Sequence, residues 1–208
     1  MSPAQRRDYQ RLASRFCIAF QQASCDVRAA FGDPGLPLIA EIGFGMGETT
    51  ALIAARRPEC NFVGIEVYKP GIGKLLGLLE SAGLTNVRII AHDAVAVLQT
   101  MIAEQELDGV HIFFPDPWPK KRHHKRRLIQ PGFVELLRRR LRRGAYVYLV
   151  TDWRDYAAQM LDVFQAVDGF RNPYGGFCDR RPWRPETSFE RKGRDRAHAI
   201  HELWLERI

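Results

Sequence analysis

The architecture of this 208-residue chain is most clearly indicated by the stretch Leu38-Ile39-Ala40-Glu41-Ile42-Gly43-Phe44-Gly45-Met46-Gly47-Glu48-Thr49. A short apolar run leads into three alternating glycines, and a helical pattern follows them. This order predicts a buried strand, a tight turn and a helix. Glycine lets the backbone turn sharply and approach a ligand closely, as in the cofactor-binding turns of α/β sheets.

Apolar runs and helical patterns continue to alternate after this stretch. The expected strands are 38–42, 61–66, 87–91, 110–114 and 145–150, and the expected helices lie near 49–57, 71–81, 94–102, 131–141 and 153–165. Continuous apolar strands that alternate with helices predict an α/β fold with a mostly parallel, doubly wound sheet. Residues 171–195, rich in Pro, Gly and Arg, predict a long functional loop. Residues 198–207 predict a final antiparallel edge strand.

A separate amphipathic segment precedes the sheet. Ser2-Pro3 is a signal for the start of a helix. Apolar residues then recur at steps of three and four from Tyr9 to Ala30, which predicts one long helix that ends near Gly32. We therefore expect two parts, an N-terminal helix and linker over residues 1–35 and the main domain over residues 36–208.

Composition narrows the classes of function. The chain has 31 Lys and Arg against 24 Asp and Glu, a net charge of +7, which favours nucleic acid over a membrane as the partner. Charged residues interrupt the N-terminus where a signal peptide would be apolar, and no apolar run reaches the roughly 18–20 residues of a membrane span. The four cysteines form no CxxC pair, so we expect reduced thiols in a cytoplasmic protein and no metal site.

Acidic side chains stand at the ends of successive strands. Glu41 and Glu48 flank the glycine turn, Glu66 closes the second strand and Asp93 follows the third. These acids would repel the pyrophosphate of a dinucleotide, and Glu48 takes the place of the P-loop lysine. They suit S-adenosylmethionine, whose sulfonium and ammonium groups are cationic; Glu66 would accept from the ribose hydroxyls and Asp93 from the adenine amino group. Glu48 as a first-turn acid and Asp93 as a helix cap are the structural alternatives.

A proline-rich segment and a basic run follow the fourth strand. Residues 113–119 read Phe-Phe-Pro-Asp-Pro-Trp-Pro, and the prolines restrict the backbone around Asp116. Trp118 either stacks on a base or packs within a rigid loop. Residues 120–127 contain six Lys or Arg in eight positions, which favours a track for RNA phosphates over a solvated loop. A second run, 138–143, has five in six and fits a helix end equally well.

Together these motifs resemble the bacterial tRNA (guanine-N7)-methyltransferase family, whose fold is the Rossmann-like class I methyltransferase fold. The resemblance extends from about residue 38 to the C-terminus and rests on residues 41–47, 64–67, 115–127, 151–153 and 187–193. It implies transfer of a methyl group from S-adenosylmethionine to N7 of the variable-loop guanosine at position 46 of tRNA. A monomer and a homodimer are both compatible with these patterns.

The resemblance also implies the residues of the site. The glycine turn and the acids would bind the cofactor through Glu41, Gly43, Gly45, Gly47, Glu66, Asp93 and Asp116. Asp116 is also the catalytic candidate. The tRNA would be bound by Lys120, Arg122, Lys125, Arg126, Arg127, Asp152, Thr187 and Glu190. In the late loop, Arg191 and Lys192 would touch phosphate.

Guanine N7 carries a lone pair and no proton, so the reaction needs alignment of the reacting atoms rather than a base. Either Asp116 or Asp152 would accept hydrogen bonds from the N1–H and N2–H₂ edge of guanine. The alternatives are a methyltransferase that acts on another RNA base or a small molecule, a non-catalytic RNA-binding protein that keeps the cofactor fold, and a dehydrogenase. The basic runs disfavour a small-molecule substrate, and the acids at the strand ends disfavour the last two.

Overall fold

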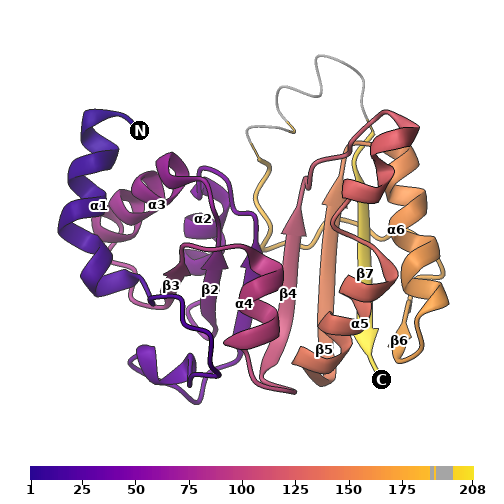
Figure 1. Ribbon diagram of the computed structural model, residues 1–208, viewed down its shortest axis with the longest axis horizontal. Helices are drawn as coiled ribbons and strands as arrows, with labels where there is room; N and C mark the ends of the chain where they lie inside the picture. Colours follow the sequence, from indigo (N-terminus) through magenta and orange to yellow (C-terminus); the bar gives the residue numbers. More distant parts are fainter. Residues whose placement is uncertain (188–189, 191–198) are drawn as a thin grey trace.

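The computed structural model describes residues 1–187, 190 and 199–208. Within these residues seven strands form one sheet in the order β3-β2-β1-β4-β5-β7-β6 (Figure 1). The strands are β1 (Leu38–Ile42), β2 (Asn61–Ile65), β3 (Val87–Ile90), β4 (Leu107–Phe113), β5 (Leu141–Thr151), β6 (Phe170–Arg171) and β7 (His201–Arg207). β1 to β5 pair in parallel, and β7 is antiparallel to both β5 and β6. The predicted α/β fold with a mostly parallel sheet is confirmed.

Helices cover both faces of the sheet (Figure 1). One face carries α1 (Pro3–Phe16), α2 (Glu48–Arg56) and α3 (Lys69–Ser81), and the other carries α4 (Ala94–Thr100), α5 (Pro131–Arg140) and α6 (Arg154–Ala166). Successive residues of a strand point to opposite faces of the sheet. In β1, Ile39 is buried with α1–α3, whereas Ala40 is buried with α4–α6. Of the helices in the described residues, none combines the length and apolar character of a membrane span.

The N-terminal helix is shorter than predicted. A capping box formed by Ser2 and Gln5 starts α1, but the helix ends at Phe16, so the prediction of one helix to residue 30 is wrong. Cys17 forms a parallel bridge with Ile89 of β3, and the Ile18 N–H donates to the Ile89 carbonyl at 2.8 Å. The chain leaves the helix because its backbone pairs with the open edge of β3. The division at residue 35 stays a prediction.

Strand boundaries also differ from the prediction. β4 and β5 begin at Leu107 and Leu141, several residues earlier than predicted, and these two residues are paired. Turn-forming residues near both starts, such as Gly109 and Gly144, conceal the strand pattern in the sequence. The short β6 has no sequence signal, and it makes the outer edge of the sheet because β7 lies between β5 and β6.

A segment without helix or strand covers part of the α1–α3 face. Residues 172–187 have no regular element, as predicted, and the Trp183 ring stacks on His111 of β4 at 5.1 Å between centroids. Arg184, which belongs to this segment, has a fully buried side chain. The loop therefore serves as a layer of the core beside β4, β5 and β7.

Helix α3 packs directly against the glycine turn after β1. A Cβ placed at Gly71 would lie only 1.7 Å from the carbonyl oxygen of Gly45, so only glycine allows this approach. By contrast, a Cβ at Gly132, in the first turn of α5, would meet nothing within 4 Å. The structure therefore leaves no room for a side chain at Gly71 and leaves room for one at Gly132.

We predict opposite effects for alanine at these two positions. Gly71→Ala forces α3 away from the turn and is expected to lower the free energy of unfolding by about 1–3 kcal/mol or more. Gly132→Ala removes backbone freedom from the unfolded chain and should leave stability unchanged or raise it by about 0.4–1 kcal/mol. Urea denaturation of both variants measures the difference. Equal midpoints for Gly71→Ala and the wild type would contradict the close packing.

Candidate active site

Six of the seven predicted cofactor residues line two cavities at the carboxyl edge of the sheet, where β1 and β4 lie side by side and the strand order reverses. The seventh, Asp93, lines neither cavity. A cavity of about 430 Å³ is lined by residues that include Gly43, Glu66, Asp116 and Trp118. A second cavity of about 230 Å³ is lined by Glu41, by residues 43–49 and by Thr187. The two cavities share Gly43, Phe113 and Phe114. Residues from distant parts of the sequence thus surround one region.

The three glycines of the turn have different roles. All have positive φ, +72° at Gly43, +57° at Gly45 and +73° at Gly47, which favours glycine at each. A Cβ at Gly43 or Gly45 would meet nothing within 4 Å, so their backbone is open to a ligand. A Cβ at Gly47 would lie 2.6 Å from that of Leu75 in α3. Gly47, the N-cap of α2, therefore packs closely against α3 and also lines the smaller cavity, and its contact with a cofactor stays a prediction.

Glu66 holds the turn in place. Its Oε2 accepts from the Gly45 N–H at 2.8 Å, and its Oε1 accepts from the N–H groups of Val67 and Tyr68 at 2.7 and 2.9 Å. One carboxylate thus joins the loops that follow β1 and β2. Oε1 thereby uses both of its lone pairs, whereas Oε2 keeps one, so Glu66 remains able to accept from a hydroxyl group in the cavity through Oε2.

Glu41 is a buried acid beside this turn, with 2% of its surface exposed. Burial raises the pKa of Glu41 to about 7; the Thr50 hydroxyl lowers it and the charge of Glu66 raises it further. Its Oε2 has no hydrogen-bond partner among the described residues. A buried carboxyl oxygen without a partner is costly, and a cationic ligand would satisfy it.

Glu48 and Asp93 lie at helix starts. Glu48 forms an ion pair with Lys74 of α3, which reduces the negative charge that it presents. Asp93 caps α4, because its Oδ1 accepts from the Ala96 N–H at 2.9 Å. The structural alternative for Asp93 is therefore realised. It is compatible with a second role, since the cap uses Oδ1 alone.

The proline-rich segment after β4 is held in an unusual conformation. Phe114 and Trp118 have φ of +51° and +43°, which costs about 1–3 kcal/mol per residue and is typical of functional sites. The Phe114 N–H donates to Val150 of β5 at 2.7 Å. Asp116 lies between these two residues, exposed at the rim of the larger cavity. Sequence reasoning missed this strain because neither strained residue is a glycine.

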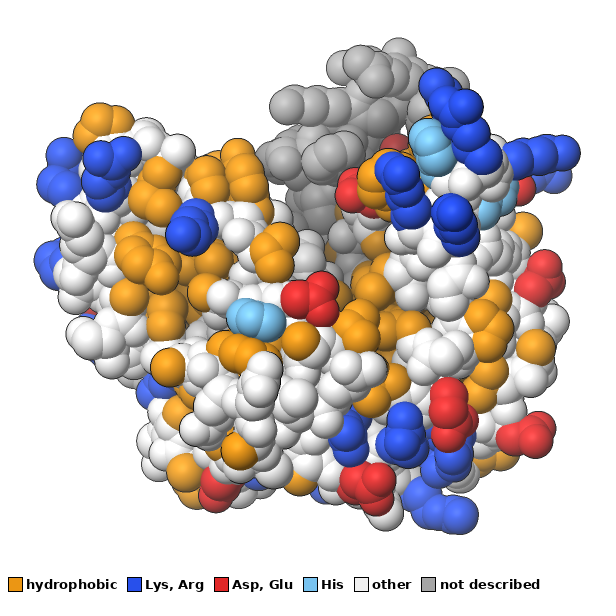
Figure 2. All heavy atoms as spheres, viewed as in Figure 1, with side chains coloured by type: hydrophobic (Ala, Val, Ile, Leu, Met, Phe, Trp, Pro, Cys, Tyr) orange, Lys and Arg blue, Asp and Glu red, His pale blue; other side chains and the backbone are white. Residues whose placement is uncertain are grey.

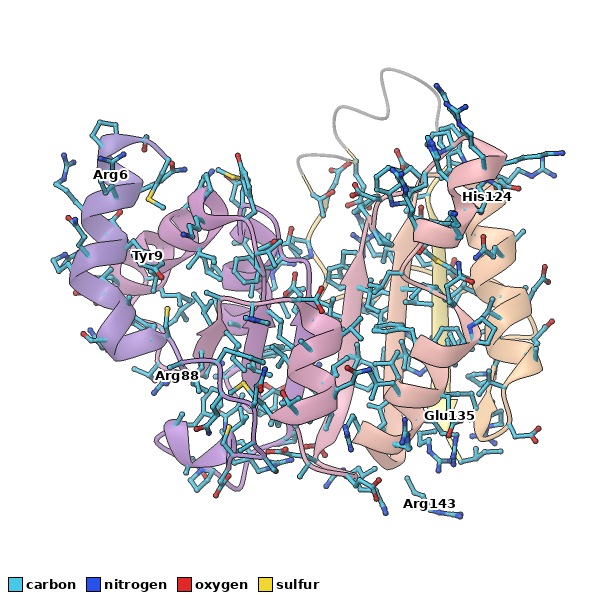
Figure 3. The ribbon with its side chains drawn as sticks, viewed as in Figure 1. Arg6, Tyr9, Arg88, His124, Glu135 and Arg143 are labelled. Atoms are coloured by element: carbon cyan, nitrogen blue, oxygen red, sulfur yellow. The ribbon has the colours of Figure 1, made fainter. Side chains whose placement is uncertain are left out.

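The basic run divides into an exposed part and a buried residue. Residues Lys121–Arg126 form the 3-10 helix η2, and the exposed cations are Lys120, Lys121, Arg122, Lys125 and Arg126. Figure 2 shows Lys and Arg side chains gathered at the upper right, where Figure 3 labels His124. The Arg126 guanidinium lies over the Trp118 ring, 5.0 Å from its centroid. These cations stand beside the larger cavity, which Arg126 also lines.

Arg127 differs from the exposed cations of the basic run. Its side chain is 1% exposed, and its guanidinium is hydrogen-bonded to the Pro117 carbonyl and to α6. The side chain has almost no exposed surface in this structure, and the RNA contact of Arg127 stays a prediction.

The second basic run lies away from the site. Arg138 pairs with Glu135, Arg140 donates to the Leu98 carbonyl at 2.6 Å, and Arg142 pairs with Asp108. Figure 3 places Arg143 and His124 at opposite ends of the molecule. The second run therefore serves the end of α5 and the start of β5, which was the structural alternative.

Thr187 and Glu190 of the late loop cap each other's backbone, as in a local turn. The Thr187 N–H donates to Glu190 Oε2 at 2.6 Å, and the Glu190 N–H donates to Thr187 Oγ1 at 3.1 Å. Arg184, 0% exposed, donates to both Glu190 oxygens at 2.9 and 2.7 Å and to Glu202 of β7 at 2.5 Å. The Glu190 carboxylate is thus engaged within the protein, and its contact with substrate stays a prediction. It orients Thr187, which lines the smaller cavity.

Arg184 is a residue that the sequence analysis missed, because an arginine in a Pro- and Arg-rich loop gives the signal of a solvated side chain. The remaining predicted residues of the late loop, Arg191 and Lys192, lie outside the described residues, as does the start of the predicted strand at residue 198.

Asp152 lies at a neighbouring groove. This groove of about 1030 Å³ is lined by Asp152, Trp153, Phe177 and His201 among others, at the carboxyl end of β5 and beside β7. Asp152 is partly buried and does not line either of the cavities around Gly43. Within the described part of the chain no cluster of three His, Cys, Asp or Glu suits a metal ion.

Comparison with known sequences gives a consistent result. A family model described as "Putative methyltransferase" matches residues 36–203. The tRNA (guanine-N(7)-)-methyltransferase of Paraburkholderia xenovorans is 51% identical over 203 residues, which cover 98% of this chain and 78% of that protein. The protein of the same name from Nitrosomonas europaea is 50% identical over 202 residues, 97% of this chain and 90% of that protein.

Solved structures share the fold. The 16S rRNA methyltransferase KamB superposes with a TM-score of 0.60 at 14% identity, over 83% of this chain and 88% of that chain. A precorrin-6y C5,15-methyltransferase from Geobacter metallireducens superposes with a TM-score of 0.58 at 12% identity, over 83% and 80%. At such identities the likeness concerns the fold alone, and it confirms the predicted methyltransferase class of α/β sheet.

We predict that Glu41 makes stability depend on pH. Its pKa is about 7 in the folded protein and has an ordinary value of 4.5, so the folded state holds a proton that the unfolded chain releases. Ionisation of the buried Glu41 carboxyl lowers the free energy of unfolding. This loss is absent below pH 4.5, grows as the pH rises and is complete above pH 7. Relative to Glu41→Gln, the wild type should therefore lose on the order of 2–3 kcal/mol between these limits. Parallel urea-denaturation profiles of the two proteins across this range would contradict the buried acid.

Proposed function

Because this chain belongs to the tRNA (guanine-N7)-methyltransferase family, we propose that it transfers the methyl group of S-adenosylmethionine to N7 of the variable-loop guanosine at position 46 of tRNA. The observation that carries this proposal is one juxtaposition: the buried acid Glu41 and the open glycine turn lie next to a rim of exposed cations. An acidic interior suits a cationic cofactor, and a basic rim suits RNA phosphates. A tRNA substrate also favours a cytoplasmic location.

The residues around Gly43 fit S-adenosylmethionine. Glu41 offers a buried carboxyl oxygen without a partner, and Gly43 and Gly45 leave their backbone open to the cavity. Glu66 and Asp93, at the ends of β2 and β3, would bind the ribose hydroxyls and the adenine amino group. When bound, the cofactor supplies an electrophilic methyl carbon, whose bond to sulfur breaks as its bond to N7 forms, so that the positive charge passes from sulfur to the purine.

The chain has to orient guanine rather than activate it, because N7 carries a lone pair and no proton. We assign the hydrogen bonds to the N1–H and N2–H₂ edge to Asp116, which lines the same cavity as Gly43 and Glu66; Asp152 lines the neighbouring groove. Fixed alignment of two reactants contributes up to roughly 7–11 kcal/mol. A carboxylate fixed near the purine also stabilises its developing positive charge.

The exposed cations beside the cavity would bind the tRNA backbone. Lys120, Arg122 and Lys125 are exposed on and next to η2, and each is free to approach a phosphate. Arg126 and Trp118, already stacked on each other, offer a flat surface to a base that has left its stack. Thr187, held by Glu190, would contact the substrate from the opposite side.

The decisive experiment uses unmodified tRNA transcripts and labelled S-adenosylmethionine. After incubation with the protein, borohydride and aniline treatment should cleave the RNA at position 46, and a transcript with adenosine at that position should remain unlabelled. Labelled tRNA that is cleaved at another guanosine would overturn the position, and labelled tRNA without cleavage would overturn N7 as the target atom. Absence of label would overturn the activity.

We predict that Asp116→Asn slows the chemical step. Loss of a fixed charge near the reacting purine should reduce the single-turnover rate about 100-fold or more, whereas the dissociation constant for tRNA should change by less than about threefold because the phosphate contacts remain. Asp162→Asn, on the exposed side of α6, is the matched control and should behave as the wild type. A normal single-turnover rate for Asp116→Asn would refute the catalytic assignment.

A further inference from the structure

Arg127 is the last residue of the basic run, yet its surroundings differ from those of the preceding cations. Its side chain is 1% exposed, whereas Lys125 and Arg126 are exposed. It lies between the proline-rich segment after β4 and helix α6. A side chain with no free surface has no access to a phosphate unless the local structure opens, so its charge must serve another purpose.

The guanidinium donates in three directions. Nε donates to the Pro117 carbonyl at 2.8 Å, Nη1 to Gln159 Oε1 at 2.5 Å and Nη2 to Asp155 Oδ2 at 2.6 Å. The guanidinium also lies over the ring of Tyr156, 4.8 Å from its centroid. It lowers the pKa of Asp155 through its hydrogen bond. Such a planar fork with fixed directions is a property of arginine that lysine lacks.

The proline-rich segment needs an external tie. Pro115, Pro117 and Pro119 have no N–H group, so this part of the backbone lacks the donors that would pair it with a neighbouring strand. The carbonyl of Pro117 receives its hydrogen bond from Arg127 instead. Asp116 and Trp118 are the residues on either side of Pro117.

The same residue also ends the 3-10 helix. The Arg127 N–H donates to the His124 carbonyl at 3.0 Å, which closes the last turn of η2. Two residues later, the Ile129 N–H donates to the Tyr156 hydroxyl at 3.1 Å. The segment from 127 to 129 is therefore tied to α6 through both Arg127 and Ile129, and η2 ends on fixed backbone.

From this geometry we infer that Arg127 is a positioning residue: it fixes the proline-rich segment and η2 on helix α6, so that Asp116 and the exposed cations keep their places, and it does not contact RNA. The inference deepens the proposed function and rests on it for the effect on methyl transfer. The anchoring itself is a property of the protein without RNA.

The anchor is tested first without RNA. Asp155→Ala removes one acceptor of Arg127 and leaves every Lys and Arg in place, so that trypsin meets the same cleavage sites. Under native conditions we expect cleavage within residues 120–126 to become at least about fivefold faster, because η2 opens more often. Asp162→Ala, on the same helix without contact to Arg127, is the matched control and should be cleaved at the wild-type rate. Equal cleavage of all three proteins would overturn the anchor whether or not the protein methylates tRNA.

The second test separates positioning from phosphate binding. Arg127→Lys keeps the charge and loses the fork; at saturating tRNA its single-turnover rate should fall at least about tenfold, while the slope of log Kd against log salt stays at the wild-type value. For Lys125→Ala the loss should show in affinity, with a salt slope smaller by about one. Urea midpoints and S-adenosylmethionine affinity verify that Arg127→Lys is folded. An unchanged single-turnover rate for Arg127→Lys would overturn the inference, because this variant keeps the charge and loses only the fork.

A wild-type protein that leaves tRNA unmethylated would refute the proposed function and leave the trypsin result as the measure of the anchor. The two failures are therefore distinguishable. Asp155→Ala extends the second test, since it should lower the methylation rate in the same direction as Arg127→Lys and keep the wild-type salt slope.

Discussion

Three backbone N–H groups from two loops converge on the carboxylate of Glu66. This interaction fixes the glycine turn after β1 relative to the loop after β2. The glycine turn also determines how closely α3 packs against it. The carbonyl oxygen of Gly45 occupies the space where a side chain at Gly71 would lie. The cavity around Gly43, which Asp116 also lines, depends on this arrangement of loops and helix.

Exposed cations and paired cations lie in different parts of the molecule. The cations that face outward beside the cavity are those on and next to η2, whereas Arg138, Arg140 and Arg142 are bound to carboxylates or carbonyls at the other end of the sheet. The net charge of +7 therefore overstates the number of cations near the site. What distinguishes the site is an acidic interior directly beneath a basic rim, and that contrast depends on the position of each charge rather than on their sum.

Much of the sheet and of the acidic site was predictable, because in a parallel sheet the residues that follow each strand meet at one edge. The rest depends on contacts between distant residues. Helix α1 ends at Phe16 since the backbone after it pairs with β3, which no local pattern indicates. Arg127 and Arg184 look like solvated cations in the sequence, but their acceptors lie on α6 and β7. The strain at Phe114 and Trp118 follows from the way the loop is tied at both ends.

The position of β7 has a consequence for how the chain is made. β5 ends at Thr151 and its neighbour β7 begins only at His201, yet β7 lies between β5 and β6. During synthesis from the N-terminus, β5 is therefore made long before β7. Until then, the edge of β5 that pairs with β7 has no partner strand. An unpaired strand edge of this kind invites association with other chains. Completion of the sheet on this side of β5 therefore depends on β7, which is made last among the strands described.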